Sequence, residues 1–308
     1  NPSARSAEVG GEVTQLKISR TSTGAAVLIH RLSLGACVTN EEDSTPDGWE
    51  EPHSAMVPEI AAMYDDNDGV LTAGTNPPYA PFQLKDSHGA LQGVELDLAR
   101  AVAGVLGLDF QPMEQDFSMI LPAVQSGQID MGVSGFTDNP DRRNEFDFVD
   151  HLYAGIQWAE RVDGPRKVDP DNPCGLTVAV QRTTVSETDD VRPKQEACNG
   201  DLTVLSYDTG DNAALAVLMG RADALSADSP VTAWAVNRSE GKMQQVGDMF
   251  QASPYGFAVP KDSDLGKASA AALQHLIETG EYAEILSRWG IEDGLIDQAM
   301  INERPING

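Results

Sequence analysis

Residues 70–82 read Val-Leu-Thr-Ala-Gly-Thr-Asn-Pro-Pro-Tyr-Ala-Pro-Phe. The first six residues form a short apolar run, which predicts a buried strand. The rest of the stretch contains three prolines, which exclude a helix or a central strand, so the chain must turn there. Apolar residues then recur at helical spacing over 93–107 and predict an amphipathic helix. A strand that leads through a loop into a helix is the unit from which α/β sheets are built.

The same alternation continues along the chain. Further strands are predicted at 129–133, 156–162, 175–180, 202–206, 223–227 and 255–259. Helices are predicted at 118–125, 184–197, 209–219, 264–279, 281–289 and 294–301. This order predicts an α/β fold with a largely parallel sheet, arranged as two blocks followed by a helical C-terminal stretch.

Charge and hydropathy exclude several classes of function. The 308 residues include 21 Lys and Arg against 48 Asp and Glu, which gives a formal net charge of −27. A field of that sign repels phosphate backbones and anionic lipid, so we expect no nucleic-acid partner and no electrostatic adsorption to membranes. No stretch of about 18 apolar residues occurs, so no transmembrane helix is expected.

The three cysteines suggest an exported protein. Cys174 and Cys198 form either a disulfide or two unpaired buried thiols, and neither belongs to a CxxC motif of the zinc or redox kind. The five histidines show no metal-ligand spacing. We therefore expect neither a metal nor a cofactor.

Residues 17–37 have the composition of a secretory signal, with basic residues, an apolar stretch and small residues before Cys37. Leu34-Gly-Ala-Cys37 resembles a bacterial lipobox, which implies that Cys37 is lipidated and becomes the mature N-terminus. His30-Arg31 interrupts the apolar stretch, and the alternative is a disordered leader with an accidental cysteine. We expect a leader over 1–37, an acidic flexible tether over 38–64 and a lipid anchor on the outer face of the cell membrane.

Four loops at predicted strand ends collect the residue types that bind a zwitterion. They cover residues 75–82, 134–142, 181–187 and 227–230. Together they contain an arginine, an aspartate, several hydroxyls and aromatic rings. Arginine binds a carboxylate through its two-pronged guanidinium, aspartate accepts from an ammonium group, and an aromatic face covers an aliphatic or cationic side chain.

Residues 70–301 resemble the type II solute-binding proteins of polar amino-acid ABC transporters, the family 3 extracellular solute-binding proteins. The most diagnostic stretch is Gly135-Phe-Thr-Asp-Asn-Pro-Asp-Arg142 followed by Phe146-Asp-Phe148. The other matching blocks, in order, are 70–82, 93–98, 116–130, 223–230, 254–262 and 280–290. The resemblance implies two lobes joined by two crossover strands, with the ligand in the cleft between them. Lobe one would span 65–158 plus 254–308, and lobe two 159–253, with any Cys174–Cys198 disulfide inside lobe two.

The resemblance also implies the residues that hold the ligand backbone. Arg142 matches the arginine that pairs with the α-carboxylate, although an arginine here could instead form a surface salt bridge. Asp228 matches the carboxylate that takes the α-ammonium, although it could instead cap the helix that follows. Gly135 and Thr137 match positions that complete this clamp, although both also suit an ordinary turn.

Other positions would contact the ligand side chain. Tyr79 and Phe117 match aromatic residues that cover the ligand, Asn76 matches a position that is often aspartate in the family, and Gln181 lies within reach. The loop after residue 180 departs from the family pattern Gly-Thr-Thr, because this chain reads Thr183-Thr184-Val185. An ungapped alignment gives Thr184 the ligand role, whereas a shift by one residue gives it to Thr183 and Thr184. Asn76 and Gln181 are neutral amides, so glutamine or a similar polar L-amino acid is the expected ligand.

The sequence therefore predicts the substrate-binding component of an ABC importer, a monomer that delivers its ligand to a membrane permease. The chain has no Walker motif, so separate ATPase subunits would supply the energy. We expect a binding protein and not an enzyme. Two alternatives stay open: an enzyme similar to cyclohexadienyl dehydratases, with Glu114 or Glu187 as its acid, and a ligand-sensing receptor subunit.

Overall fold

The computed structural model describes residues 45–46, 48–65, 68–291 and 294–306. By its internal contacts the chain divides into residues 1–39 and 40–308, and all described residues belong to the second unit. The expected leader and Cys37 lie outside the described residues.

The described chain alternates between strands and helices. The strands are β1 (Val70–Thr75), β2 (Leu84–Lys85), β3 (Leu91–Gln92), β4 (Asp109–Glu114), β5 (Met131–Gly132), β6 (Phe146–Arg161), β7 (Thr177–Gln181), β8 (Thr203–Tyr207), β9 (Ala224–Asp228), β10 (Met243–Pro260), β11 (Met300–Ile301) and β12 (Arg304–Pro305). The helices are α1 (Pro58–Ala61), α2 (Val94–Leu106), α3 (Phe117–Gln125), the 3₁₀ turn η2 (Arg142–Asn144), the π-helical segment η3 (Ser186–Val191), α4 (Arg192–Ala197), α5 (Gly210–Leu218), α6 (Ser229–Arg238), α7 (Asp264–Thr279) and α8 (Glu281–Arg288).

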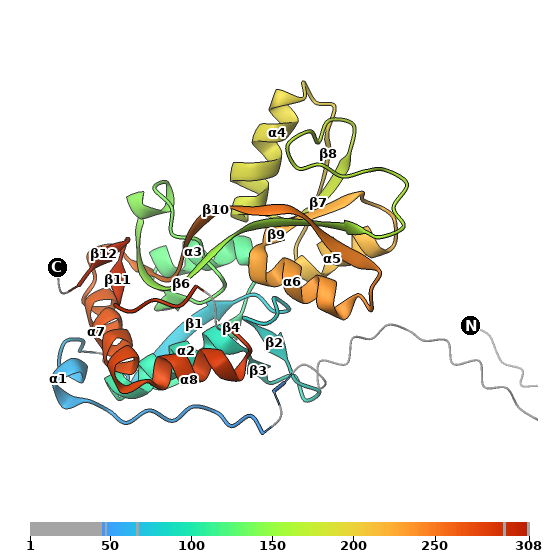
Figure 1. The fold of residues 1–308 in the computed structure, drawn as a ribbon. Coiled ribbons are helices and arrows are strands. Elements are labelled where there is room, and N and C mark those ends of the chain that lie inside the picture. Colours follow the sequence, from blue (N-terminus) through green and yellow to red (C-terminus); the bar gives the residue numbers. More distant parts are fainter. Residues whose placement is uncertain (1–44, 47, 66–67, 292–293, 307–308) are drawn as a thin grey trace, which may run out of the picture. The chain divides into compact units, whose positions relative to one another are not determined.

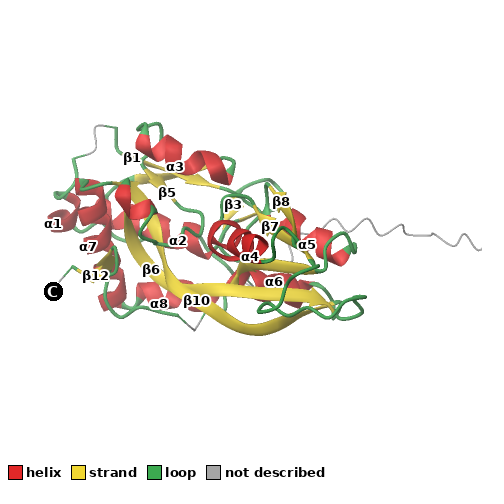
Figure 2. Ribbon diagram, turned by 90° about the horizontal axis from the view of Figure 1, so that it is seen from above, coloured by secondary structure: helices red, strands yellow, loops and turns green. Residues whose placement is uncertain are grey.

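Two long strands connect two α/β halves. The strand order is β4-β1-β5-β10-β6-β9-β7-β8, and the antiparallel strands β6 and β10 occupy its middle (Figures 1 and 2). On one side β1 runs parallel to β4 and β5, and on the other β7 runs parallel to β8 and β9. We call the half with β1, β4 and β5 the first lobe and the half with β7, β8 and β9 the second lobe. The boundaries expected after residue 158 and before residue 254 fall inside β6 and β10.

Each lobe has its own apolar core. In the first lobe α2 packs against α7, and Leu96, Leu98, Val102 and Leu273 are almost fully buried. Helix α2 ends at Gly107, whose left-handed backbone (φ 73°) is the usual stop for a helix. In the second lobe Trp158, Val178 and Val180 form a separate apolar cluster. The apolar core of each lobe thereby holds the parallel strands, and with them the loops at their carboxyl ends, in place.

The expected flexible tether over 38–64 is wrong for its described part, because residues 48–64 pack on the first lobe. Trp49 Nε1 donates to Asp97 Oδ2 at 2.7 Å, and Ser54 Oγ donates to Glu281 Oε2 at 2.7 Å. The Val57 amide donates to the Val105 carbonyl at 3.0 Å. An acidic composition indicated a solvated chain, but Trp49 and Val57 contribute apolar contacts that the average composition conceals.

The predicted helix over 294–301 is also wrong. The Ile296 amide donates to Tyr282 Oη at 3.1 Å and the Ala299 amide to Gln274 Oε1 at 2.9 Å. Because side chains of α7 and α8 accept from these amides, the described segment forms bends in place of a helix and leads into β11. The strands predicted at 156–162 and 255–259 are only parts of β6 and β10, which have 16 and 18 residues.

Cys174 and Cys198 form a disulfide in the structure, with a Cα–Cα distance of 5.4 Å. The bond connects the segment before β7 to the end of α4, so it lies within the second lobe. Of the two readings left open by the sequence, the structure has the paired one.

Candidate functional site

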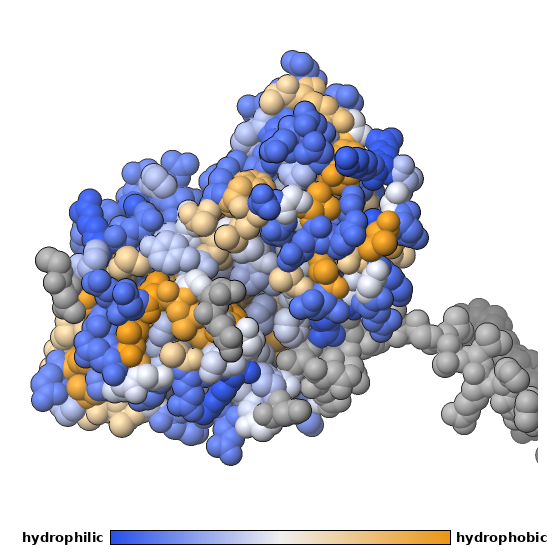
Figure 3. All heavy atoms as spheres, viewed as in Figure 1, coloured by the Kyte–Doolittle hydropathy of each residue, from blue (hydrophilic) through white to orange (hydrophobic). Residues whose placement is uncertain are grey.

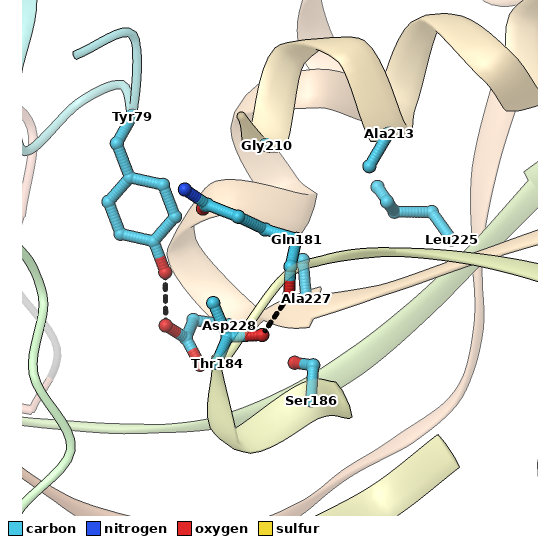
Figure 4. A pocket seen from close by; sticks show the side chains of 9 residues that line it. All are labelled: Tyr79, Gln181, Thr184, Ser186, Gly210, Ala213, Leu225, Ala227 and Asp228. Carbon is cyan, nitrogen blue, oxygen red and sulfur yellow. Dashed lines mark hydrogen bonds between the residues drawn. The ribbon is translucent and has the colours of Figure 1, made fainter. Parts of the chain in front are cut away.

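The loops predicted to bind the ligand meet where the parallel strands of the two lobes end. Asn76 and Tyr79 follow β1, Gly135 and Thr137 follow β5, and Asp228 is the last residue of β9. Gln181 ends β7, and Thr184 follows it. The pocket at this point is lined by Tyr79, Gln181, Thr184, Ser186, Gly210, Ala213, Leu225, Ala227 and Asp228 (Figure 4).

Tyr79 and Asp228 connect the two lobes inside this pocket. The Tyr79 hydroxyl donates to Asp228 Oδ2, and both residues are buried (Figure 4). Burial raises the pKa of Asp228 above its ordinary value, and the hydroxyls of Tyr255 and Tyr79 oppose that rise. Asp228 precedes α6 but makes no capping hydrogen bond with its side chain. The carboxylate is therefore directed into the pocket and not to the helix end.

Asn76 and Gln181 make a second connection between the lobes. Gln181 Nε2 donates to Asn76 Oδ1 at 2.7 Å and to the Asp208 carbonyl at 3.1 Å. Asn76 Nδ2 donates in turn to the Gln115 carbonyl at 2.9 Å. The Gln181 Oε1 atom is buried and has no hydrogen-bond partner. Gln181 lines the pocket, so this oxygen is an acceptor that belongs to a pocket residue and has no partner in the protein.

Arg142 lies on η2 and is not among the residues that line the pocket, but its charge interacts with Asp228 and Tyr79, which are. Its Nη1 donates to the Thr137 carbonyl at 2.9 Å, and its Nη2 lies 3.4 Å from the Thr183 carbonyl of the second lobe. The guanidinium stands over the Phe136 ring, 5.5 Å from its centroid. Burial lowers the pKa of Arg142, and the negative charge of Asp228 opposes this effect. The contacts with carbonyls and an aromatic ring differ from the surface salt bridge that was the alternative.

Phe117 has a supporting position. Its ring stacks on Phe136 with centroids 4.8 Å apart, which places it behind the ring that Arg142 covers. Phe117 does not line the pocket around Gln181. Gly135 is next to Tyr79, since a Cβ atom added to Gly135 would lie 2.6 Å from Tyr79 Cε1.

The backbone of the loop after β7 is consistent with the ungapped alignment, in which Thr183 stands at the family's glycine. The backbone of Thr183 is left-handed with φ 61°. This is the region that glycine enters without steric cost. The Thr184 hydroxyl donates to the Gln181 carbonyl at 2.8 Å, so Thr184 is the residue whose position next to the ligand remains a prediction.

Sequence reasoning missed several residues of the site. Ser186, Gly210, Ala213, Leu225 and Ala227 line the pocket. Leu225 and Ala227 are two residues apart in β9 and so lie on one face of the strand, and this period of two was the available signal. Gly210 is the first residue of α5, and nothing in its local sequence indicates a site.

The two acids named for an enzymatic alternative have other partners. Glu114 forms an exposed ion pair with Lys85 at 2.5 Å. Glu187 accepts from the Thr183 amide at 2.8 Å and from Arg192 at 2.9 Å, and neither acid lines the pocket. Neither carboxyl group is placed to transfer a proton to a molecule in the pocket. Within the described ranges, no helix has the length and apolar character needed to cross a membrane.

Comparison with known proteins gives consistent matches. The sequence profile of "Bacterial extracellular solute-binding proteins, family 3" matches residues 71–292. The chain is 58% identical over 300 residues to the "Arginine-binding protein ArgT" of Corynebacterium glutamicum, covering 94% of this chain and 99% of that protein.

Two solved structures share the fold. An ancestral arginine-binding protein bound to arginine has a TM-score of 0.68 and 31% identity, covering 73% of this chain and 100% of that chain. The same type of ancestral protein bound to glutamine has a TM-score of 0.67 and 30% identity, covering 73% and 99%.

Proposed function

The chain belongs to the bacterial extracellular solute-binding proteins of family 3, and we propose that it is the substrate-binding component of an ABC importer for L-arginine. The observation that carries this proposal is the 58% identity to an arginine-binding protein over nearly the full length of both chains. The two-lobed fold and the pocket at the strand ends supply the matching architecture.

The relatives do not support the expected preference for glutamine. Asn76 and Gln181 are neutral amides, which by residue type alone suit a neutral side chain. What matters physically is whether they offer a donor or an acceptor. Gln181 Nε2 already has two acceptors, so only Oε1 is left to contact a ligand.

A free acceptor favours a ligand side chain that carries N–H groups. The guanidinium of arginine has five N–H donors in a rigid planar arrangement. A carboxylate side chain has only acceptors, so it would leave Oε1 of Gln181 unsatisfied. We therefore infer that the pocket accepts arginine and excludes glutamate.

In this proposal the ligand backbone binds across both lobes. Arg142 takes the α-carboxylate and Asp228 the α-ammonium, with Gly135, Thr137 and Thr184 completing the clamp. Tyr79 covers the aliphatic part of the side chain, and Phe117 acts indirectly, by stacking on the Phe136 ring over which Arg142 stands. Asn76 and Gln181 bind the guanidinium.

Isothermal titration of the full chain tests the proposal, with L-arginine, L-citrulline, L-glutamine and L-glutamate as ligands. Citrulline is the decisive comparison, because it keeps the shape of arginine but lacks the charge. We expect micromolar or tighter arginine binding, about 8 kcal/mol or more, weaker binding of citrulline and glutamine, and none of glutamate. Arg142→Ala should weaken arginine binding by about 2–5 kcal/mol, because the ligand carboxylate loses its partner. If glutamine binds more tightly than arginine, the arginine assignment is wrong, and if no amino acid binds, the importer role is wrong too.

The rest of the assembly is part of the same proposal. The protein would act as a monomer held by lipidated Cys37 on the outer face of the cell membrane, and would pass arginine to a permease with separate ATPase subunits. Mass spectrometry of the N-terminal peptide from cells tests the anchor, with Cys37→Ala as the control. A lipid mass on wild type alone would support it, whereas an unmodified Cys37 would contradict it.

A further inference from the structure

A buried polar cluster lies behind the loop that follows β5. Its centre is Glu95, in the first turn of α2 and 1% exposed. His151 Nε2 on β6 lies 3.0 Å from Glu95 Oε1, and Gln83 Nε2 donates to Glu95 Oε2. The Gly135 amide also donates to Glu95 Oε2, at 2.8 Å. Three different segments of the first lobe therefore meet on one carboxylate.

The partners of Glu95 are themselves fixed. The His151 carbonyl accepts from Tyr282 Oη at 2.7 Å, and the His151 ring packs on Phe257 with centroids 4.5 Å apart. Gln83 is fully buried. The carboxylate of Glu95 is thus held in place from α2, β6 and the loop before β2, and it can act as a fixed acceptor.

Gly135 lies three residues beyond the end of β5 and has a left-handed backbone. It has φ 63°, and its amide points inward to Glu95 and not along the sheet. Thr137 follows two residues later, and its carbonyl accepts from Arg142. The bond between the Gly135 amide and Glu95 therefore fixes the start of this loop. The residues that follow are held by β10, since the Gly256 amide donates to the Phe136 carbonyl and the Asp138 amide to the Pro254 carbonyl, both at 2.9 Å.

A buried amide without an acceptor is costly, and a bond to a charged acceptor is about twice as strong as a neutral one. Removal of the Glu95 carboxylate would leave the Gly135 amide and the Gln83 side chain without their acceptor. The loop would then lose the contact that fixes its start at Gly135, and the position of Thr137, with Arg142 bonded to its carbonyl, would shift between that point and the bonds to β10. Glu95 itself does not line the pocket.

We propose that Glu95 is a positioning residue for ligand binding: held by His151 and Gln83, it fixes the Gly135 amide and so orients the loop that carries Thr137 and Arg142. The ligand effect rests on the proposed arginine binding, whereas the effect on the loop does not.

The test combines titration with L-arginine and nuclear magnetic resonance of the Gly135 amide, both on the full chain. Glu95→Ala and Glu95→Asp should weaken arginine binding roughly 10- to 100-fold. The first substitution removes the carboxylate, and the second shortens the side chain so that its carboxylate no longer reaches the Gly135 amide. Glu95→Gln should stay within about fivefold of wild type, because one amide oxygen can still accept from Gly135 and Gln83. The Gly135 amide proton should resonate far downfield in wild type and move upfield in the Ala and Asp variants.

Asp97→Ala is the matched control. Asp97 lies two residues further along α2, is equally buried at 1% exposure, and accepts from Trp49 and Trp289 away from the pocket. Its loss should lower the melting temperature but leave arginine affinity within threefold and the Gly135 resonance unchanged. Equal weakening by Asp97→Ala and Glu95→Ala would overturn the positioning role, as would unchanged binding in Glu95→Ala.

Two further outcomes are decided by the same data. Should Glu95→Ala not fold, the difference between the Asp and Gln variants decides the proposal by the same criteria. Should wild type not bind arginine, the proposed function is wrong, and the Gly135 resonance alone then supports or overturns the role of Glu95 in the loop.

Discussion

The hydroxyl of Tyr79 donates to the carboxylate of Asp228, so a side chain of the first lobe satisfies the acid that the second lobe presents to the pocket. We predict that Asp228→Asn weakens arginine binding roughly 10- to 100-fold, because an ammonium group loses a charged acceptor. Tyr79→Phe keeps the ring and removes only the hydroxyl, and it should change the affinity by less than about fivefold. Titration calorimetry of both variants checks this. Asp228→Asn binding as tightly as wild type would remove Asp228 from the site.

Gly135→Ala tests how closely Tyr79 approaches the loop. The new Cβ would lie 2.6 Å from Tyr79 Cε1, in a backbone with φ 63°. Gly127→Ala is the control, since Gly127 has a similar φ of 73° but no atom within 4 Å of the added Cβ. Gly127→Ala should cost about 1–2 kcal/mol of unfolding free energy from the backbone alone. Gly135→Ala should cost more and also weaken arginine binding at least about tenfold. Equal effects of the two substitutions on stability and affinity would show that Tyr79 adapts without cost.

Thr183→Gly should stabilise the protein. A β-branched residue at φ 61° is strained by about 1–3 kcal/mol, and glycine relieves this strain. Glycine also loses more chain entropy on folding, which costs about 0.5–1 kcal/mol and offsets part of the gain. The expected gain is about 1 kcal/mol in urea unfolding. Asn199→Gly provides the comparison, because Asn199 has φ 53° but asparagine tolerates this conformation, so little gain is expected. A loss of stability in Thr183→Gly would contradict the strain.

Stability should decrease from pH 4 to pH 9 because of Asp150. Burial, followed by the negative charge of Asp138, raises the pKa of Asp150 from 3.8 to about 9. Between these values the folded protein holds a proton that the unfolded chain releases. The unfolding free energy therefore falls with rising pH, by up to about 1.4 kcal/mol per pH unit for one proton.

Asp150→Asn removes this dependence and keeps an oxygen that can accept from the Glu303 amide, which lies 2.7 Å from Asp150 Oδ2. Urea unfolding of both proteins at several pH values is the measurement. The variant should show a flatter profile and be the more stable protein at pH 8. Parallel profiles for the two proteins would mean that Asp150 does not retain its proton.

Local sequence predicted the elements whose signals are local. The apolar run of β1 and the helical spacing of α2 and α7 need no partner to be recognised, and the bounds of β1 and α7 match the prediction. The first half of β6 was missed because Asp147, Asp150 and His151 are polar, although all three are buried. Their burial depends on Asn302, the Glu303 amide and Glu95, which are distant in sequence.

In the site, too, some residues could be predicted from local sequence, whereas others depend on residues far away in the chain. Arg142 and Asp228 stand in recognisable motifs, and the structure brings both to the pocket region. The donor and acceptor pattern of Gln181 could not be predicted, because it is set by Asn76, 105 residues away, and by a carbonyl 27 residues away. The expected preference for glutamine, which the relatives do not support, was based on residue type without the bonds that orient the amide.

The central place of β10 has a consequence for the order in which the chain is made. This strand lies between β5 and β6, yet it is the last long strand to be synthesised, and α7 and α8 follow it. The sheet of the first lobe therefore stays interrupted until about residue 260 has left the ribosome. A nascent chain therefore cannot complete its first lobe until nearly all of its sequence has been made, although the strands β1, β4 and β5 that begin this lobe are among the first to emerge.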